Sequence, residues 1–148
     1  MKTTYQHLNT IQKGSFGEAY AKMAFTLEGF EVYDSEYDDR GVDFVVRSQS
    51  GKFLSVQVKS TDATSNPFVK EDKFIASSDY LLCAVRLTEG QLPSIYLARG
   101  SEWNETNDHL HYNPNGGASG AYYEMRFAAK YAVALRSNLF SNYVETLR

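Results

Sequence analysis

The chain has 148 residues, of which 43% are hydrophobic and 22% are charged, and its net charge is -3. This length suits one domain with its own hydrophobic core, and no run of about 18 apolar residues predicts a membrane span. The negative charge excludes whole-molecule attraction of a polyanion, so a nucleic-acid partner would need a local basic or metal-bearing patch. The start lacks an apolar leader, and the one cysteine, Cys83, lies in an apolar run, which together predict a soluble cytoplasmic protein.

The first predicted element is an amphipathic helix. Large apolar residues recur at steps of four, three, four and three: Phe16, Tyr20, Met23, Leu27 and Phe30. Because residues at this spacing share one side of a helix, the pattern predicts a helix with this stripe facing the core and its end near Gly29.

Two pairs of strands are predicted after the helix. Residues 30–36 predict a short strand, and residues 42–47 and 52–60 predict antiparallel strands joined by a four-residue polar turn. Residues 79–87 form the strongest apolar run and predict a central strand, with residues 93–99 as its hairpin partner.

The remaining segments have weaker patterns. Residues 61–78 leave a short helix and an irregular crossover as open alternatives, and residues 111–120, with three glycines and one proline, predict a mobile surface loop. Residues 121–148 have helical spacing and predict one or two closing helices. The order of elements therefore predicts an α/β domain with a mixed central sheet, flanked by the N-terminal helix and the C-terminal helices.

The hairpin over residues 42–60 carries polar residues in otherwise apolar strands. Because side chains alternate along a strand, Gln57 and Lys59 share one face, with Cα atoms about 6.6 Å apart. A turn centred near Ser50 places Asp43 opposite a residue close to Gln57. Two oxygen ligands and a cation thus converge at one end of the hairpin. This arrangement suits hydrolysis of a phosphodiester by a Mg²⁺ ion, with the lysine stabilising charge or orienting the nucleophile.

Three short motifs follow one another along the chain: Gly17 and Glu18, then Val42 and Asp43, then Gln57, Val58 and Lys59. Their order resembles the PD-(D/E)XK superfamily of nucleases. Within it, the pattern resembles the branch of archaeal-type Holliday-junction resolvases, Mrr-like restriction enzymes and related uncharacterised bacterial domains. The match covers Gly14 to Ser60 well and the later strands in outline.

The resemblance implies a restriction-endonuclease-like core, a single nuclease-like domain over residues 1–148 and a DNA endonuclease that uses Mg²⁺ or Mn²⁺. It implies that Asp43 is the main metal ligand and that Gln57 is a second ligand. It further implies that Glu18 assists in metal or water positioning and that Lys59 is the catalytic lysine. Because many relatives cut two strands as dimers, a homodimer is expected. The chain departs from the family pattern at Val42, where proline is usual, and at Gln57, where an acid is usual.

Other interpretations of these residues stay open. Residues 15–18 match a capping box, so Glu18 could simply close the helix N-terminus. Asp43 could bond turn amides, and Gln57 and Lys59 could face solvent on a half-exposed strand. The alternative function is a catalytically degenerate nuclease-fold domain that binds nucleic acid or a protein partner, which the loss of one negative charge at Gln57 favours.

Outside this constellation the pattern is less specific. Asp38 and Asp39 precede Asp43 and are candidates for an accessory metal ligand. His109 and His111 lack the further cysteine or histidine of a zinc site, so no zinc is predicted. The basic residues of the later segments are scattered and predict no linear basic patch: Lys70, Lys73, Arg86, Arg99, Lys130 and Arg136.

Overall fold

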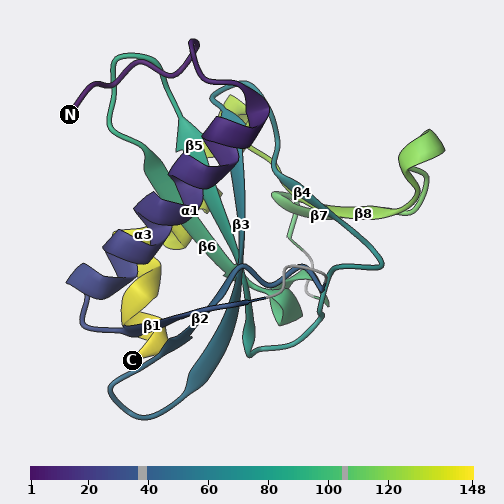
Figure 1. Ribbon diagram of the computed structural model, residues 1–148. Helices are drawn as coiled ribbons and strands as arrows, with labels where there is room; N and C mark the ends of the chain where they lie inside the picture. Colours follow the sequence, from purple (N-terminus) through teal and green to yellow (C-terminus); the bar gives the residue numbers. More distant parts are fainter. Residues whose placement is uncertain (37–39, 105–106) are drawn as a thin grey trace.

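The computed structural model of the protein describes residues 1–36, 40–104 and 107–148 (Figure 1). Its N-terminal helix and its strands are α1 (Thr10–Leu27), β1 (Glu31–Asp34), β2 (Phe44–Arg47), β3 (Phe53–Asp62), β4 (Phe68–Lys70), β5 (Tyr80–Leu87), β6 (Ser94–Arg99), β7 (Leu110–Asn113) and β8 (Tyr122–Met125). The C-terminal segment forms the one-turn helices α2 (Ala132–Leu135) and α3 (Phe140–Tyr143) with 3-10 turns around them. None of the helices in the described ranges is long and apolar enough to span a membrane.

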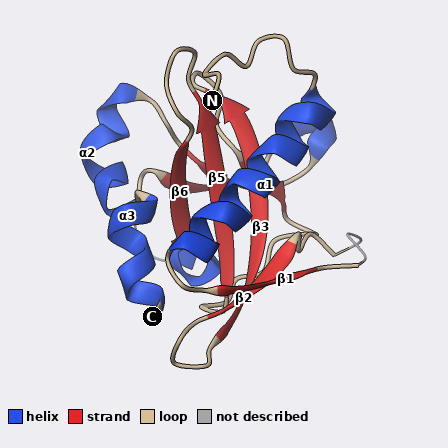
Figure 2. Ribbon diagram, turned by 60° about the vertical axis from the view of Figure 1, so that its left-hand side comes forward, coloured by secondary structure: helices blue, strands red, loops and turns tan. Residues whose placement is uncertain are grey.

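Within the described residues, the main sheet has five strands in the order β1-β2-β3-β5-β6. β2 runs antiparallel to β1 and β3, β3 runs parallel to β5, and β5 runs antiparallel to β6. Helix α1 lies across one face, and the C-terminal helices lie beside β6 (Figure 2). The predicted mixed α/β architecture and both predicted hairpins are therefore confirmed. β5 is an interior strand, as predicted, since it pairs with both β3 and β6, and β3 takes the middle place in the order.

A second sheet of three strands, β4-β8-β7, was not predicted. Strand β4 lies within the otherwise irregular crossover. Strand β7 continues into the segment predicted as a loop, so that prediction is wrong for residues 111–113. Strand β8 lies in the segment predicted as helix, so that prediction is wrong for Tyr122–Met125. In such a short aromatic run, the positions of the apolar residues fit the alternation of a strand and the spacing of a helix equally well. The segment forms a strand because it pairs with β4 and β7. The hairpin of β7 and β8 extends away from the main sheet (Figure 1).

Helix α1 begins earlier than the apolar stripe indicated. The Asn9 side chain accepts a hydrogen bond from the Gln12 backbone N–H at 2.9 Å, and Gln12 Oε1 accepts one from the Asn9 N–H at 3.0 Å. This reciprocal capping box starts the helix, so residues 15–18 lie inside it and the capping interpretation of Glu18 is wrong. The end near Gly29 is confirmed, since this glycine follows the last turn at a φ of 85°.

The buried face of α1 differs from the predicted stripe. Its buried residues are Gly17, Ala21 and Phe25, whereas Met23 and Leu27 are 49% and 81% exposed. The reason is a close approach between α1 and β3. A Cβ atom at Gly17 would lie 1.8 Å from Ser60 Oγ, so a larger residue would force the two elements apart. The predicted stripe is therefore right in part: Phe16, Tyr20 and Phe30 pack in or against the core, whereas Met23 and Leu27 do not.

Two hydrophobic clusters occupy opposite faces of the main sheet. The cluster under α1 includes Phe25 and Val56, and the cluster toward the small sheet includes Leu82 and Met125. Because side chains alternate along β3, its even-numbered residues face α1 and its odd-numbered residues face the small sheet. This confirms the predicted faces of β3, and it places Gln57 on the side of the small sheet.

Candidate functional site

Asp43 lies where β2 separates from β3. Its backbone N–H donates to the Val56 carbonyl at 2.9 Å, and its carboxylate oxygen Oδ2 accepts a hydrogen bond from the Val58 N–H at 2.6 Å. Phe44 pairs with Val56 in the ladder, which confirms that Asp43 lies opposite a residue close to Gln57. The Asp43 carboxylate thus accepts a β3 hydrogen bond that a backbone carbonyl would accept if the ladder between β2 and β3 continued. This contact holds the carboxylate beside the segment of Gln57, Val58 and Lys59.

Gln57 is buried, with 6% of its surface exposed, and the interpretation that it faces solvent is wrong. The Tyr80 hydroxyl donates to Gln57 Oε1 at 2.6 Å. Burial, and then the negative charge of Asp43, raise the pKa of Tyr80, so its hydroxyl remains a hydrogen-bond donor at neutral pH. Gly41, at a φ of 74°, lets the chain pass close by, since a Cβ atom there would lie 3.3 Å from Gln57 Oε1.

Changing Tyr80 to phenylalanine should lower the free energy of unfolding by about 1–3 kcal/mol, because Gln57 Oε1 then stays buried without its donor. Urea denaturation measures this loss. The matched control is Tyr112→Phe, which removes an exposed hydroxyl that donates to Glu71 at 2.8 Å and should change stability by less than about 0.5 kcal/mol. Equal losses in the two variants would show that the buried hydrogen bond contributes no more than the surface one.

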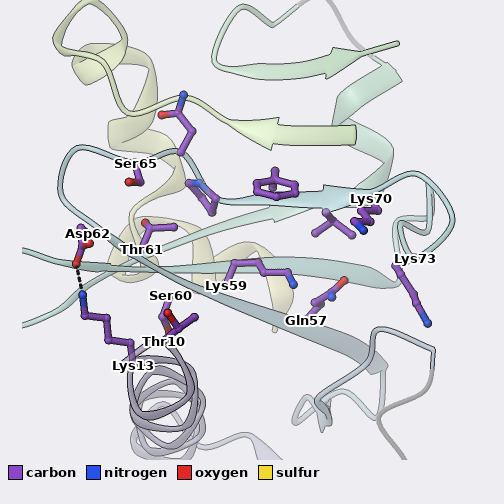
Figure 3. A pocket seen from close by; sticks show the side chains of 14 residues that line it. Thr10, Lys13, Gln57, Lys59, Ser60, Thr61, Asp62, Ser65, Lys70 and Lys73 are labelled. Carbon is purple, nitrogen blue, oxygen red and sulfur yellow. Dashed lines mark hydrogen bonds and ion pairs between the residues drawn. The ribbon is translucent and has the colours of Figure 1, made fainter. Parts of the chain in front are cut away.

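Gln57 and Lys59 line a groove of about 500 Å³ between α1, β3 and β4 (Figure 3). Among the described residues that line it are four lysines: Lys13, Lys59, Lys70 and Lys73. The same lining contains one carboxylate, Asp62, which is paired with Lys13 at 2.9 Å. The groove is therefore basic although the whole chain is acidic. Sequence inspection missed this basic surface because its lysines come from separate elements.

Lys59 extends along β3 toward Gln57, and the Lys13–Asp62 pair lies at the other end of the groove (Figure 3). The Lys59 side chain is half-buried. Within the part of the chain that the structure describes, no hydrogen bond or ion pair engages its ammonium group. A half-buried ammonium that faces a basic groove can bind a phosphate oxygen directly.

Glu18 makes a different set of contacts. Its carboxylate pairs with Lys22 at 2.7 Å, and Lys22 also pairs with Asp34 at 2.8 Å. The described contacts thus bring Asp43 into contact with the segment that holds Gln57 and Lys59, and they do not include Glu18. The other candidate carboxylates, at positions 38 and 39, lie outside the described residues.

Asp43 and Gln57 supply oxygen atoms of the kind that Mg²⁺ prefers. No group of three or more His, Cys, Asp or Glu that could hold a metal ion occurs among the described residues. Mg²⁺, however, is commonly held by one or two carboxylates, with water and substrate phosphates as the other ligands. The Gln57 oxygen has two lone pairs, of which Tyr80 takes one. The residues therefore fit a metal ion that is bound largely through water and substrate.

No family model matches this chain, and no curated protein matches it. Among solved structures, a bacterial homing endonuclease, I-Ssp6803I, is similar to the chain with 20% sequence identity and a TM-score of 0.49. The similarity covers 83% of this chain and 82% of that one.

Proposed function

We propose that this chain is a metal-dependent DNA endonuclease that hydrolyses phosphodiester bonds beside Gln57 and Lys59. The observation that carries the proposal is the hydrogen bond from the Val58 N–H to Asp43. It holds the carboxylate against β3, the strand that bears Gln57 and Lys59. The basic groove that begins at these residues suits a phosphate backbone. The motif order that resembles the PD-(D/E)XK nucleases supports the same activity.

Each residue has its own part in the proposed reaction. The groove lysines bind the phosphates and position the strand. A Mg²⁺ or Mn²⁺ ion, when bound by Asp43 and Gln57, would polarise the phosphate and supply an acidified water. The Lys59 ammonium stabilises the negative charge that develops on the phosphate oxygens during attack. Glu18 keeps the assisting role that the motif order implies, which requires its carboxylate to leave Lys22.

A second candidate is a domain that binds nucleic acid without cutting it. Gln57 favours this candidate because an uncharged amide attracts a metal ion less strongly than a carboxylate does. In addition, the Tyr80 hydrogen bond occupies part of the amide oxygen. The lysine lining would bind phosphates equally well in either case.

Cleavage assays separate the two candidates. Supercoiled, linear, branched and single-stranded DNA are incubated with the protein in Mg²⁺, Mn²⁺ or EDTA. We expect cleavage that EDTA abolishes and that Lys59→Ala lowers about a hundredfold, because a stabilising charge is lost. The matched control is Lys52→Ala, which removes an exposed lysine from the turn between β2 and β3 and should cleave like the wild type.

The outcomes point in different directions. Binding of DNA without cleavage in either metal would support the second candidate and overturn the first. Cleavage at the wild-type rate by Lys59→Ala would show that this lysine is not catalytic. Cleavage that persists in EDTA would contradict the metal requirement.

A further inference from the structure

Strand β4, in the small sheet, forms one wall of the basic groove. Lys70 pairs with Tyr122 across β4 and β8, and Phe68 lies on the same face, two residues before Lys70. The opposite face, which holds Val69 and Met125, is buried in the second hydrophobic cluster. Phe68 and Lys70 both line the groove. The groove thus runs along β4, and Phe68 and Lys70 of the outer face of this strand contribute to its lining.

Phe68 and Tyr122 form an aromatic pair on this outer face. Their ring centroids are 5.3 Å apart at an interplanar angle of 57°. Phe68 is 44% exposed and is among the residues that line the groove. We call these two residues the aromatic wall. Because the ring of Tyr122 supports that of Phe68, the accessible part of the Phe68 ring is held in place.

We propose that the aromatic wall stacks on an unpaired base of a single-stranded nucleic acid whose phosphates lie along the groove lysines. This inference rests on the proposed function in that it names the form of nucleic acid that the same groove binds. Single-strand binding combines a positively charged groove with an aromatic ring that meets the face of a base. Both features occur here in one groove: Lys59 and Lys70 supply ammonium groups, and Phe68 supplies the ring.

The same geometry disfavours a fully paired duplex as the ligand of the aromatic wall. In a duplex, both faces of an internal base are covered by its neighbours, so Phe68 could reach it only after the base is unstacked. An unpaired base avoids this cost. Lys70 follows Phe68 at about 6.6 Å along the same strand face, so its ammonium can contact the phosphate of the stacked nucleotide.

Binding measured in EDTA tests this inference without any cleavage step. The probes are a fluorescently labelled oligothymidylate and a labelled duplex of the same length, and the readout is fluorescence anisotropy. Phe68→Ala should weaken oligothymidylate binding about five- to hundredfold and change duplex binding by less than about twofold. Phe68→Leu should weaken it to a similar extent, since leucine keeps an apolar side chain but has no aromatic face.

The chain offers a matched control at another exposed aromatic pair. Phe53 is 57% exposed, its ring lies 6.3 Å from that of Tyr33, and it does not line the groove. Phe53→Ala should therefore bind both probes like the wild type. Because Phe53 and Phe68 are both exposed aromatic residues on strands, a difference between the two variants reports on the groove and not on the loss of a surface ring.

Several results would overturn the inference. Phe68→Ala could weaken the binding of both probes equally, or bind oligothymidylate as tightly as Phe53→Ala does. Phe68→Leu could bind oligothymidylate with the wild-type affinity, or the wild type could fail to bind it. Failure of the nuclease proposal looks different. A protein that binds oligothymidylate through Phe68 but cleaves no substrate in Mg²⁺ or Mn²⁺ would overturn the nuclease and support the aromatic wall. Metal-dependent cleavage of DNA, together with oligothymidylate binding that does not depend on Phe68, would support the nuclease and overturn the aromatic wall.

Discussion

Changing Asp43 to alanine should lower metal-dependent cleavage by about a thousandfold, the largest catalytic effect that we expect. Two losses combine in this variant. The proposed metal site loses its negatively charged ligand, and the Val58 N–H loses the carboxylate that accepts its hydrogen bond at 2.6 Å. The rate is measured on the best substrate in Mg²⁺ and in Mn²⁺, and the heat of Mn²⁺ binding is measured alongside it.

Asp43→Asn separates these two losses. Asparagine keeps an oxygen that can accept from Val58 but carries no charge, so the variant should fold like the wild type and still fail to cleave. The control is Asp108→Asn, which neutralises an exposed carboxylate outside the groove lining and should change neither property. Full activity in Asp43→Asn would contradict the role of Asp43 as a charged metal ligand.

The arrangement of Asp43, Gln57 and Lys59 could be predicted from the sequence because one hairpin carries it. The polar turn sets the register between β2 and β3, and alternation along β3 then decides which side chains share a face. Both effects act within about 20 residues of chain and need no knowledge of tertiary packing. The contact between Tyr80 and Gln57 could not be predicted in this way, since it depends on the parallel pairing of β3 with β5.

The basic groove could not be predicted because its lysines meet only through long-range packing. Lys13 reaches the groove because α1 lies close to β3 at Gly17, and Lys70 reaches it because β4 pairs with β8. Neither contact has a local sequence signal. The sequence therefore shows an acidic chain with scattered cations, whereas the folded chain gathers four of these cations in one groove.

The face of α1 is predicted only in part, since Leu27 of the expected stripe is exposed, and Phe25 tests the observed face. Phe25 is fully buried, and its ring lies 5.5 Å from Phe30, 6.0 Å from Phe44 and 5.1 Å from Phe140 between centroids. Phe25→Ala should lower the free energy of unfolding by about 3–5 kcal/mol, because it leaves a cavity where three rings meet. Leu27→Ala, on the predicted stripe, should lower it by less than about 0.5 kcal/mol.

Chemical denaturation of both variants decides between the two faces of the helix. A larger loss in Leu27→Ala than in Phe25→Ala would support the predicted stripe and contradict the observed packing. If Phe25→Ala is too unstable to purify, Phe25→Leu makes a smaller cavity and should still lose more than Leu27→Ala. The test also bears on the candidate site, because Phe44 contacts Phe25 and directly follows Asp43. Loss of the Phe25 ring should therefore loosen the end of β2 that holds the carboxylate.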